Sequence, residues 1–307
     1  MARHGHHHHH HDHGAGLGSR RLLWAVLVNL GLTVAQIVGG LLAGSLALIA
    51  DAVHNLSDAV SLVIAWGAAR IALRPADARM TFGYRRAEVL AAFVNYLLLI
   101  VIGLYLAWEA VLRFLDPPSV DGWLVVVVAG VAFAVDLATA ALTFAQSRHS
   151  MNIRAAFLHN VADALGSVAV IVAGTLILLY DWRLADPAVT LVIAGYMLWH
   201  GVAEIGGSIR ILLLGTPPDV AFLEVQERLA EVEGVREVHH LHLWQLDEHR
   251  VSVEAHLVVE PEHWEQSDAI AAAARRVLRE AFGIAHATLE TERPNSCAEE
   301  GNTVAAC

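Results

Sequence analysis

Six long runs of apolar residues occupy the first two thirds of the chain. They cover residues 22–43, 46–73, 89–112, 123–145, 155–180 and 187–214. At about 1.5 Å per residue, each run is long enough to cross about 30 Å of hydrocarbon. Backbone polar groups in lipid must be bonded within the segment, so each run is predicted to be a helix. The pattern therefore predicts a membrane protein with an all-α six-helix transmembrane bundle over 21–214, preceded by an arm at 1–20.

The pattern changes after Leu214. An amphipathic helix is predicted first, then two strands that alternate between apolar and polar residues, a second helix and a third strand. Their ranges are 219–232, 235–246, 250–259, 263–282 and 284–292. The order αββαβ in so short a segment predicts a small α+β domain over 215–293, with helices on one face of a sheet. The remaining residues, 294–307, are expected to form a disordered tail.

Composition agrees with a membrane protein. The 307 residues are 56% hydrophobic and 17% charged, whereas soluble domains carry about 25% charged residues. The net charge of −11 and the absence of a basic patch argue against a nucleic-acid partner. The two cysteines, Cys297 and Cys307, both lie in the polar tail, which excludes a disulfide framework and is compatible with a reducing compartment.

Arginine, the only basic residue type besides histidine, sets the expected orientation. It is concentrated in the N-terminal segment and in the connections after the second and fourth runs. The connections on the opposite side contain only Arg113 and Arg183, beside several aspartates. Because positive charge accumulates in cytoplasmic loops, both termini are predicted to be cytoplasmic.

One motif, H-N-x-x-D-A, occurs twice, at 54–59 in the second run and at 159–164 in the fifth. The i, i+4 spacing places His54 and Asp58 on one helix face, and His159 and Asp163 on another. Two imidazoles and two carboxylates can complete a tetrahedral shell around Zn²⁺, and their charge of −2 matches a divalent cation.

Energetics strengthens this prediction, because an ionised aspartate near the bilayer centre costs several kcal/mol unless it is paired. The middle of each run contains no arginine. A proton or a metal ion must therefore neutralise these aspartates. Asp51, Asn55 and Asn160 are expected to support the ligands or to line the ion's path. Asp136, a single carboxylate in the fourth run, has no predicted partner.

The motifs together resemble those of the cation diffusion facilitator family, in its zinc-exporting branch. They are A-D-A-x-H-N-x-x-D-A, F-G-Y-R-R-A-E (82–88), H-N-x-x-D-A and V-H-H-L-H-L-W (238–244), and the likeness extends from about residue 20 to 292. The resemblance implies a homodimer in the bacterial inner membrane that exchanges cytoplasmic Zn²⁺ for protons. It also implies a ferredoxin-like cytoplasmic domain that binds further zinc as a regulatory ligand. The family's transport ligands correspond to His54, Asp58, His159 and Asp163.

The same resemblance suggests ligands in the cytoplasmic domain. It places them at His239 and His256, with a carboxylate at Glu292, and His286 and Cys297 are further candidates. Strand alternation predicts that His240 and His242 face away from His239. The alternative is that exposed strand histidines are only solvated.

Two features of the sequence, a departure from a family pattern and a run of histidines, bear on metal binding. Some members bind zinc in the connection after the second span, but this chain keeps Asp77 and has Met80 and Tyr84 where histidine would lie, so no such site is predicted. The run of six histidines at 6–11 could be a native metal-binding arm or a purification tag, and the sequence does not decide between them.

Three classes of function remain to be compared. A membrane-embedded zinc hydrolase is disfavoured, because catalytic zinc keeps a position open for water and no HExxH or GxSxG motif is present. A zinc sensor would not need paired ligands inside the membrane. A proton-coupled antiporter that exports Zn²⁺, and also Cd²⁺ or Co²⁺, uses all these features. Protons and metal would compete for the same side chains, since imidazole titrates near neutral pH.

Overall fold

The computed structural model describes residues 18–147 and 151–294. The histidine run, Cys297 and residues 295–307 of the predicted tail therefore lie outside the described residues. The described residues form two compact units. One comprises the chain up to Val60 together with Leu99–Leu198, and the other comprises Ser61–Leu98 and the chain from Trp199 onward. The domain boundaries expected at 20/21, 214/215 and 293/294 remain predictions.

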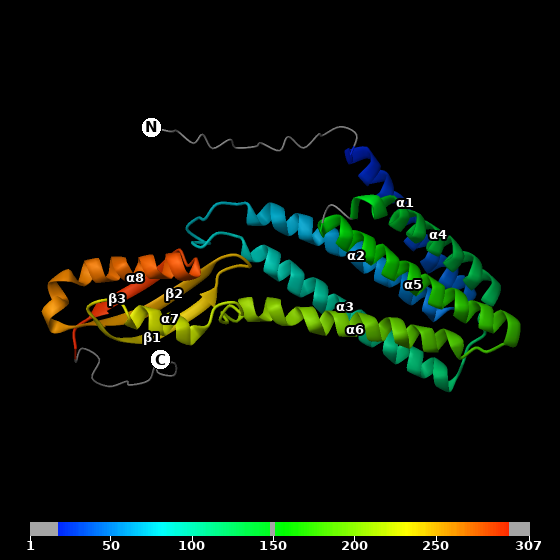
Figure 1. Cartoon of the computed structure of the whole chain (residues 1–307). Helices are drawn as coiled ribbons and strands as arrows, with labels where there is room; N and C mark the ends of the chain where they lie inside the picture. The colour runs from blue at the N-terminus through cyan, green and yellow to red at the C-terminus, as the bar shows by residue number, and fades with distance from the viewer. Residues whose placement is uncertain (1–17, 148–150, 295–307) are drawn as a thin grey trace. The chain divides into compact units, whose positions relative to one another are not determined.

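Six long helices correspond one to one to the six apolar runs (Figure 1). They are α1 (Gly18–Ala43), α2 (Leu46–Ala72), α3 (Arg86–Leu115), α4 (Gly122–Ser147), α5 (Met151–Tyr180) and α6 (Ala185–Leu212). Five of them are long and apolar enough to cross a membrane, and α1 adds the apolar stretch Leu30–Ala43. Many of their leucine and valine side chains are exposed, as expected of surfaces that contact lipid. The prediction of a helical transmembrane bundle is confirmed.

Small residues allow the helices of the first unit to pack closely. Gly122, at the start of α4, approaches the α5 backbone so closely that a Cβ there would lie 2.6 Å from the carbonyl oxygen of Gly174. A Cβ at Gly174 would in turn lie 2.8 Å from Cγ1 of Val125. Helices in lipid associate through such close contacts, because burial of apolar surface gives little driving force there. Tight packing of α4 on α5 therefore fixes the helix that carries the second H-N-x-x-D-A motif.

The beginning of α2 is held by a carboxylate from α6. Asp186, which is 1% exposed, accepts hydrogen bonds from the backbone N–H groups of Leu46 at 2.8 Å and Ala47 at 3.3 Å. The hydroxyl of Ser45 donates to the same carboxylate. These bonds satisfy N–H groups that the first turn of a helix leaves without partners. Two turns later, α2 reaches the first H-N-x-x-D-A motif.

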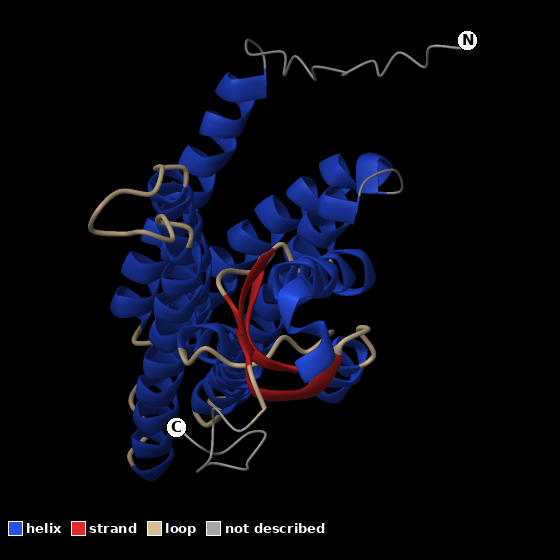
Figure 2. Cartoon of the chain, turned by 90° about the vertical axis from the view of Figure 1, so that its left-hand side faces the viewer, coloured by secondary structure: helices blue, strands red, loops and turns tan. Residues whose placement is uncertain are grey.

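The C-terminal domain, in the second unit, has the predicted order αββαβ. Its elements are α7 (Phe222–Ala230), β1 (Val235–Gln245), β2 (Val251–Val259), a 3₁₀ turn (Pro261–Gln266), α8 (Ser267–Phe282) and β3 (His286–Glu292). The strands lie side by side in the order β1-β2-β3 (Figure 2), with β1 antiparallel and β3 parallel to β2. The predicted α+β fold class is confirmed. The helix expected from residue 263 begins four residues later, after the 3₁₀ turn opened by Pro261.

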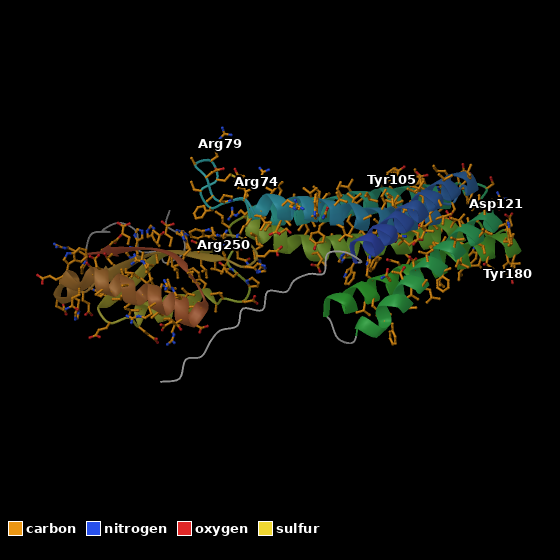
Figure 3. All side chains as sticks on the ribbon, turned by 90° about the horizontal axis from the view of Figure 1, so that it is seen from above. Arg74, Arg79, Tyr105, Asp121, Tyr180 and Arg250 are labelled. Atoms are coloured by element: carbon orange, nitrogen blue, oxygen red, sulfur yellow. The ribbon has the colours of Figure 1, made fainter. Side chains whose placement is uncertain are left out.

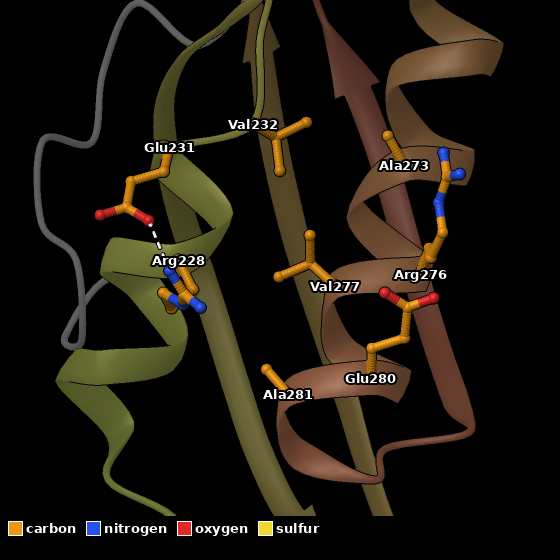
Figure 4. Close-up of a pocket in the computed structure, with 8 residues that line it drawn as sticks. All are labelled: Arg228, Glu231, Val232, Ala273, Arg276, Val277, Glu280 and Ala281. Atoms are coloured by element: carbon orange, nitrogen blue, oxygen red, sulfur yellow. Dashed lines mark hydrogen bonds and ion pairs between the residues drawn. The ribbon is translucent and has the colours of Figure 1, made fainter.

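The core of this domain lies between the sheet and its two helices. Val225 and Leu229 of α7, Leu278 of α8 and Leu257 of β2 are fully buried there. Figure 4 shows α7 and α8 on the same face of the sheet. A groove of about 550 Å³ separates their outer surfaces. An ion pair between Arg228 and Glu231, 3.1 Å long, lies along it.

The connection between α2 and α3 belongs to the same unit as the C-terminal domain. Asp77 organises this loop, because its carboxylate accepts bonds from the Tyr84 hydroxyl at 2.7 Å and from the backbone N–H groups of Arg79 and Met80. The hydrogen bond from Tyr84, and then those from the backbone, lower the pKa of Asp77. Arg74 and Arg79 lie on this loop, and Arg250 lies in the β1–β2 turn (Figure 3).

Two arginines join the loop region to the C-terminal domain. Arg86, in the F-G-Y-R-R-A-E motif, donates from Nε to the carbonyl oxygen of Leu246 at 2.9 Å and from Nη2 to that of Gln245 at 3.2 Å. Arg250 donates to the carbonyl oxygen of Phe82 at 3.5 Å. The ring of Phe82 packs edge-on against His286. The motif therefore anchors the start of α3 on the sheet.

Candidate metal centres

The two H-N-x-x-D-A motifs meet in the first unit, where α2 and α5 run side by side (Figure 1). Nε2 of His54 lies 3.8 Å from Asp58 on its own helix and 3.8 Å from Asp163 on α5. Nε2 of His159 lies 3.5 Å from Asp58 and 3.4 Å from Asp163. Each imidazole therefore faces both carboxylates, through different oxygens of Asp163. One ligand atom each from His54, Asp58 and Asp163 lies within 4.8 Å of the others, and His159 lies outside this compact group.

These distances suit a coordination shell better than a set of hydrogen bonds. An N–H···O bond spans about 2.7–3.2 Å, whereas the four contacts span 3.4–3.8 Å. A tetrahedral ion with bonds of about 2.0–2.2 Å separates its ligand atoms by about 3.3–3.6 Å. Oδ2 of Asp58 and Oδ1 of Asp163 are buried and accept no hydrogen bond from the residues that the structure describes. Both oxygens are thus available to a cation.

The cluster is enclosed on one side and open on the other. The side chains of Asp163 and His54 are 9% and 13% exposed, whereas those of Asp58 and His159 are 35% and 48% exposed. A hydrated ion can therefore approach over His159 and Asp58. His54 also meets the edge of the Tyr196 ring on α6, at 5.8 Å between ring centres. A tyrosine in an apolar run gave no sequence signal for this contact.

The three residues expected beside the quartet differ in position. Asn55 is buried on α2 and Asn160 is half-buried on α5. Asp51 is buried, but its carboxylate bonds to Gln36 of α1 and Ser167 of α5. It thus belongs to a separate polar cluster.

The C-terminal domain holds a second group of metal-ligand side chains. Nε2 of His239 lies 3.3 Å from Glu292, and Nδ1 of His256 lies 2.6 Å from the other oxygen of that carboxylate. One ligand atom from each of the three residues falls within 4.8 Å of the others. His239 pairs with His256 across β1 and β2, and Glu292 closes the group from β3. Glu290 adds a carboxylate 3.7 Å from Nε2 of His256, a neighbour that the sequence did not suggest.

The prediction that His240 faces away from His239 is wrong. Its ring stacks on that of His256, with 4.9 Å between centres, and also meets the edge of His239. The cause is a β-bulge, because three steps along β1 from His239 to His242 oppose two steps along β2. His240 adopts the left-handed conformation there, with φ of 47°. Period-two alternation does not hold across an inserted residue.

His286 does not join this group. It pairs with Ser252, four residues along β2 from His256, and is exposed beside Phe82. His242 is exposed and pairs with Glu254.

Comparison with known proteins finds related proteins over nearly the whole chain. Residues 22–213 match the family model described as the cation efflux transmembrane domain, and residues 217–294 match the cation efflux protein, cytoplasmic domain. A zinc transporter ZitB from Pectobacterium atrosepticum is 40% identical over 277 residues, which is 89% of this chain and 85% of that protein. A ZitB from Escherichia coli is 35% identical over 94% of this chain and 92% of its own length.

A further relative is described as a cadmium, cobalt and zinc/H(+)-K(+) antiporter, from Bacillus subtilis. It is 34% identical over 280 residues, covering 90% of each chain. The relatives are transporters rather than enzymes. The chain accordingly belongs to the cation efflux family, the cation diffusion facilitators, and is a multi-pass membrane transporter that exports metal cations.

Proposed function

We propose that this protein exports Zn²⁺ in exchange for protons, with His54, Asp58, His159 and Asp163 as the ligands of the transported ion. The observation that carries the proposal is the convergence of the four side chains, in which each imidazole lies 3.4–3.8 Å from both carboxylates. Two neutral imidazoles and two carboxylates carry a charge of −2, which neutralises a divalent cation. Such neutrality is needed because a net charge in the membrane interior is costly. Nitrogen and oxygen donors in a tetrahedron favour Zn²⁺ and accept Cd²⁺ or Co²⁺.

Proton coupling follows from the chemistry of the ligands. Zinc binds neutral imidazole and ionised carboxylate, so protons and metal compete for one set of side chains. An empty site with a charge of −2 would be costly to carry through the membrane. Protonation of the site cancels part of this negative charge and lowers the cost. Uptake of protons from the outer side would therefore favour zinc release there and the return of the site.

The remaining features fit the same proposal. The arginine distribution supports cytoplasmic termini in the bacterial inner membrane. Residues 21–214 would form the transmembrane domain, and 215–293 a cytoplasmic domain that pairs in a homodimer. There His239, His256 and Glu292 would bind zinc as a regulatory ligand.

Transport into sealed vesicles tests the proposal. Purified protein in liposomes should move zinc faster when an opposing proton gradient is imposed, and should move protons in the opposite direction. Zinc binding without any flux would instead favour a membrane-bound zinc sensor. Zinc flux at one rate with or without a proton gradient would overturn the coupling.

A further inference from the structure

A second buried polar cluster lies in the first unit, apart from the metal-ligand quartet. Asp51 of α2 and Asp136 of α4 are 3% and 6% exposed. The hydroxyl of Ser167, on α5, joins them: it lies 3.3 Å from Oδ2 of Asp51 and 3.4 Å from Oδ2 of Asp136. Gln36 of α1 donates from Nε2 to Oδ2 of Asp51 at 2.7 Å. Four helices thus converge on two carboxylates.

The cluster is built tightly around Asp51. A Cβ at Gly166, one residue before Ser167, would lie 3.2 Å from Oδ1 of Asp51. Glycine there leaves room for the carboxylate between α2 and α5. Hard cations such as Mg²⁺ or Ca²⁺ take six or more oxygen ligands, and two carboxylates bridged by one hydroxyl do not supply them. This donor set suits a proton rather than a metal ion.

The buried cluster contains fewer hydrogen-bond donors than acceptors. The Ser167 hydroxyl carries one hydrogen and can donate to only one of its two carboxylate neighbours. The other contact is a hydrogen bond only if that carboxyl group is protonated. Gln36 is fully buried. Its Nε2 donates to Asp51, but Oε1 of the same amide has no hydrogen-bond partner among the described residues. Leaving buried acceptors without donors costs free energy, and a proton on one of the two carboxylates would reduce that cost.

We propose that Asp51 and Asp136, bridged by Ser167, share one proton and form a proton-carrying site separate from the zinc ligands. This inference rests on the proposed proton-coupled export and assigns one of the exchanged protons to named residues. Among the described residues, those that contact the two buried carboxylates include no arginine, so both cannot remain ionised in a membrane interior at modest cost while the zinc site is empty.

The charged groups around the pair connect it to the zinc site. Asp51 is within electrostatic reach of Asp136 on α4 and Asp163 on α5. Asp136 is within reach of His159 and Asp163 on α5. The neighbour from α1, Gln36, is neutral. Asp163 is therefore the acidic ligand whose charge both members of the pair sense.

This arrangement couples the two ions through charge. When Zn²⁺ neutralises Asp163, repulsion on the pair falls and the pair releases its proton as H⁺, leaving both carboxylates ionised. When zinc departs, the negative charge returns and one carboxylate binds H⁺ again as a carboxylic acid. By linkage, a proton on the pair must weaken zinc binding by the same factor. Zinc and the proton thus alternate, although they occupy different side chains.

The experiment compares wild-type protein with Asp136→Asn and Asp51→Asn in the same liposome assay, in potassium-free buffer. Zinc uptake and proton movement are measured together, and zinc affinity is measured by calorimetry. Asparagine keeps the size and a hydrogen-bonding oxygen but cannot carry the proton. We expect about one proton fewer per zinc and a zinc affinity that depends less steeply on pH than in the wild type, because only the protons that exchange at the quartet remain linked to zinc binding. Asp116→Asn, an exposed carboxylate between α3 and α4, is the matched control and should keep the wild-type ratio.

The outcomes separate this inference from the proposed function. Wild-type protein that moves no protons would contradict proton-coupled export itself. Wild-type coupling with an unchanged proton ratio in both asparagine variants would overturn only the shared-proton site. If either variant does not fold, infrared spectroscopy of the wild type and of Ser167→Ala provides the test. A carboxylic acid band at neutral pH, lost on zinc binding and shifted by Ser167→Ala, supports the site, and its absence overturns it.

Discussion

Oδ2 of Asp58 on α2 lies 3.5 Å from Nε2 of His159 on α5, and within the described part of the chain this buried oxygen accepts no hydrogen bond. Nε2 of His54 approaches the same oxygen at 3.8 Å. The carboxylate of the first motif is therefore shared between the imidazoles of both motifs. Since neither motif is complete without the other, loss of one ligand should disable the whole centre.

Replacing Asp58 or Asp163 with alanine should abolish zinc transport while the fold is retained. Each change removes one ligand and one negative charge from a site of charge −2. Loss of a residue that merely supports a ligand costs about 10–100-fold in metal affinity, so loss of a ligand should cost at least about 100-fold. Zinc uptake in liposomes and calorimetric affinity measure the effect. The exposed Asp116→Ala is the matched control, and preserved uptake in Asp58→Ala would show that zinc travels by another path.

Zinc bound by the C-terminal domain should depend on His239 and His256 but not on His242. The full chain carrying Asp58→Ala, in which the transmembrane centre is disabled, isolates this binding. His239→Ala or His256→Ala should lower the zinc bound per chain, because each ring is within 3.3 Å of Glu292. His242→Ala should leave it unchanged, since that ring is exposed and pairs with Glu254. Equal loss in all three variants would argue against a defined site.

His240 offers a sharper test of the bulge. Its left-handed backbone suits glycine, whereas alanine would retain the strain and lose the ring. His240→Gly should therefore be the more stable of the two variants, by about 1 kcal/mol in the free energy of unfolding. Chemical denaturation of the two proteins measures the difference. Equal stability would show that the backbone relaxes at this position.

Local rules explain why so much of the fold was predictable. The six helices follow from the thickness of a bilayer and the need to bond every backbone group within it, and both constraints act on consecutive residues. The domain order αββαβ follows from hydrophobic periodicity. The bulge at His240 was not predictable, because the chain offers no glycine there to mark a left-handed residue. The capping of α2 by Asp186 was missed because the partners are 140 residues apart.

The candidate sites likewise combine residues that local sequence rules predict with contacts that those rules do not predict. The four side chains of the quartet could be predicted to converge because one motif is repeated in two membrane-spanning helices. Ser167 gave no signal as the partner of Asp136, because a hydroxyl in an apolar run becomes informative only when helix packing places it beside a carboxylate. Tyr196 likewise reaches His54 only through the approach of α6. Contacts between helices depend on packing that a single sequence does not encode locally.

The loop after α2 should lose order in acid. The Tyr84 hydroxyl, and then the backbone of Met80 and Arg79, lower the pKa of Asp77 below its ordinary value of 3.8. A depressed pKa means that the ionised form stabilises the folded loop above that value, and that this contribution is lost as the pH falls through the lower folded pKa. Hydrogen exchange at the amides of Arg79 and Met80, corrected for intrinsic rates, should increase there. Tyr84→Phe should move the transition to higher pH, and an unchanged transition would contradict the role of this hydroxyl.

The bond between Arg86 and the β1–β2 region should be essential for holding the α2–α3 loop on the C-terminal domain. Its guanidinium donates to two consecutive carbonyl groups, of Gln245 and Leu246, which a single ammonium cannot match in geometry. Each lost hydrogen bond to a charged group costs about 1.5–3 kcal/mol. Arg86→Ala should accelerate hydrogen exchange at Leu246, whose N–H bonds to the carbonyl of Arg250 at 2.8 Å. Arg86→Lys should restore only part of the protection, and Arg79→Ala, on the exposed loop, should leave exchange at Leu246 unchanged. Full protection in Arg86→Ala would show that Arg250 and Phe82 hold the two segments together without it.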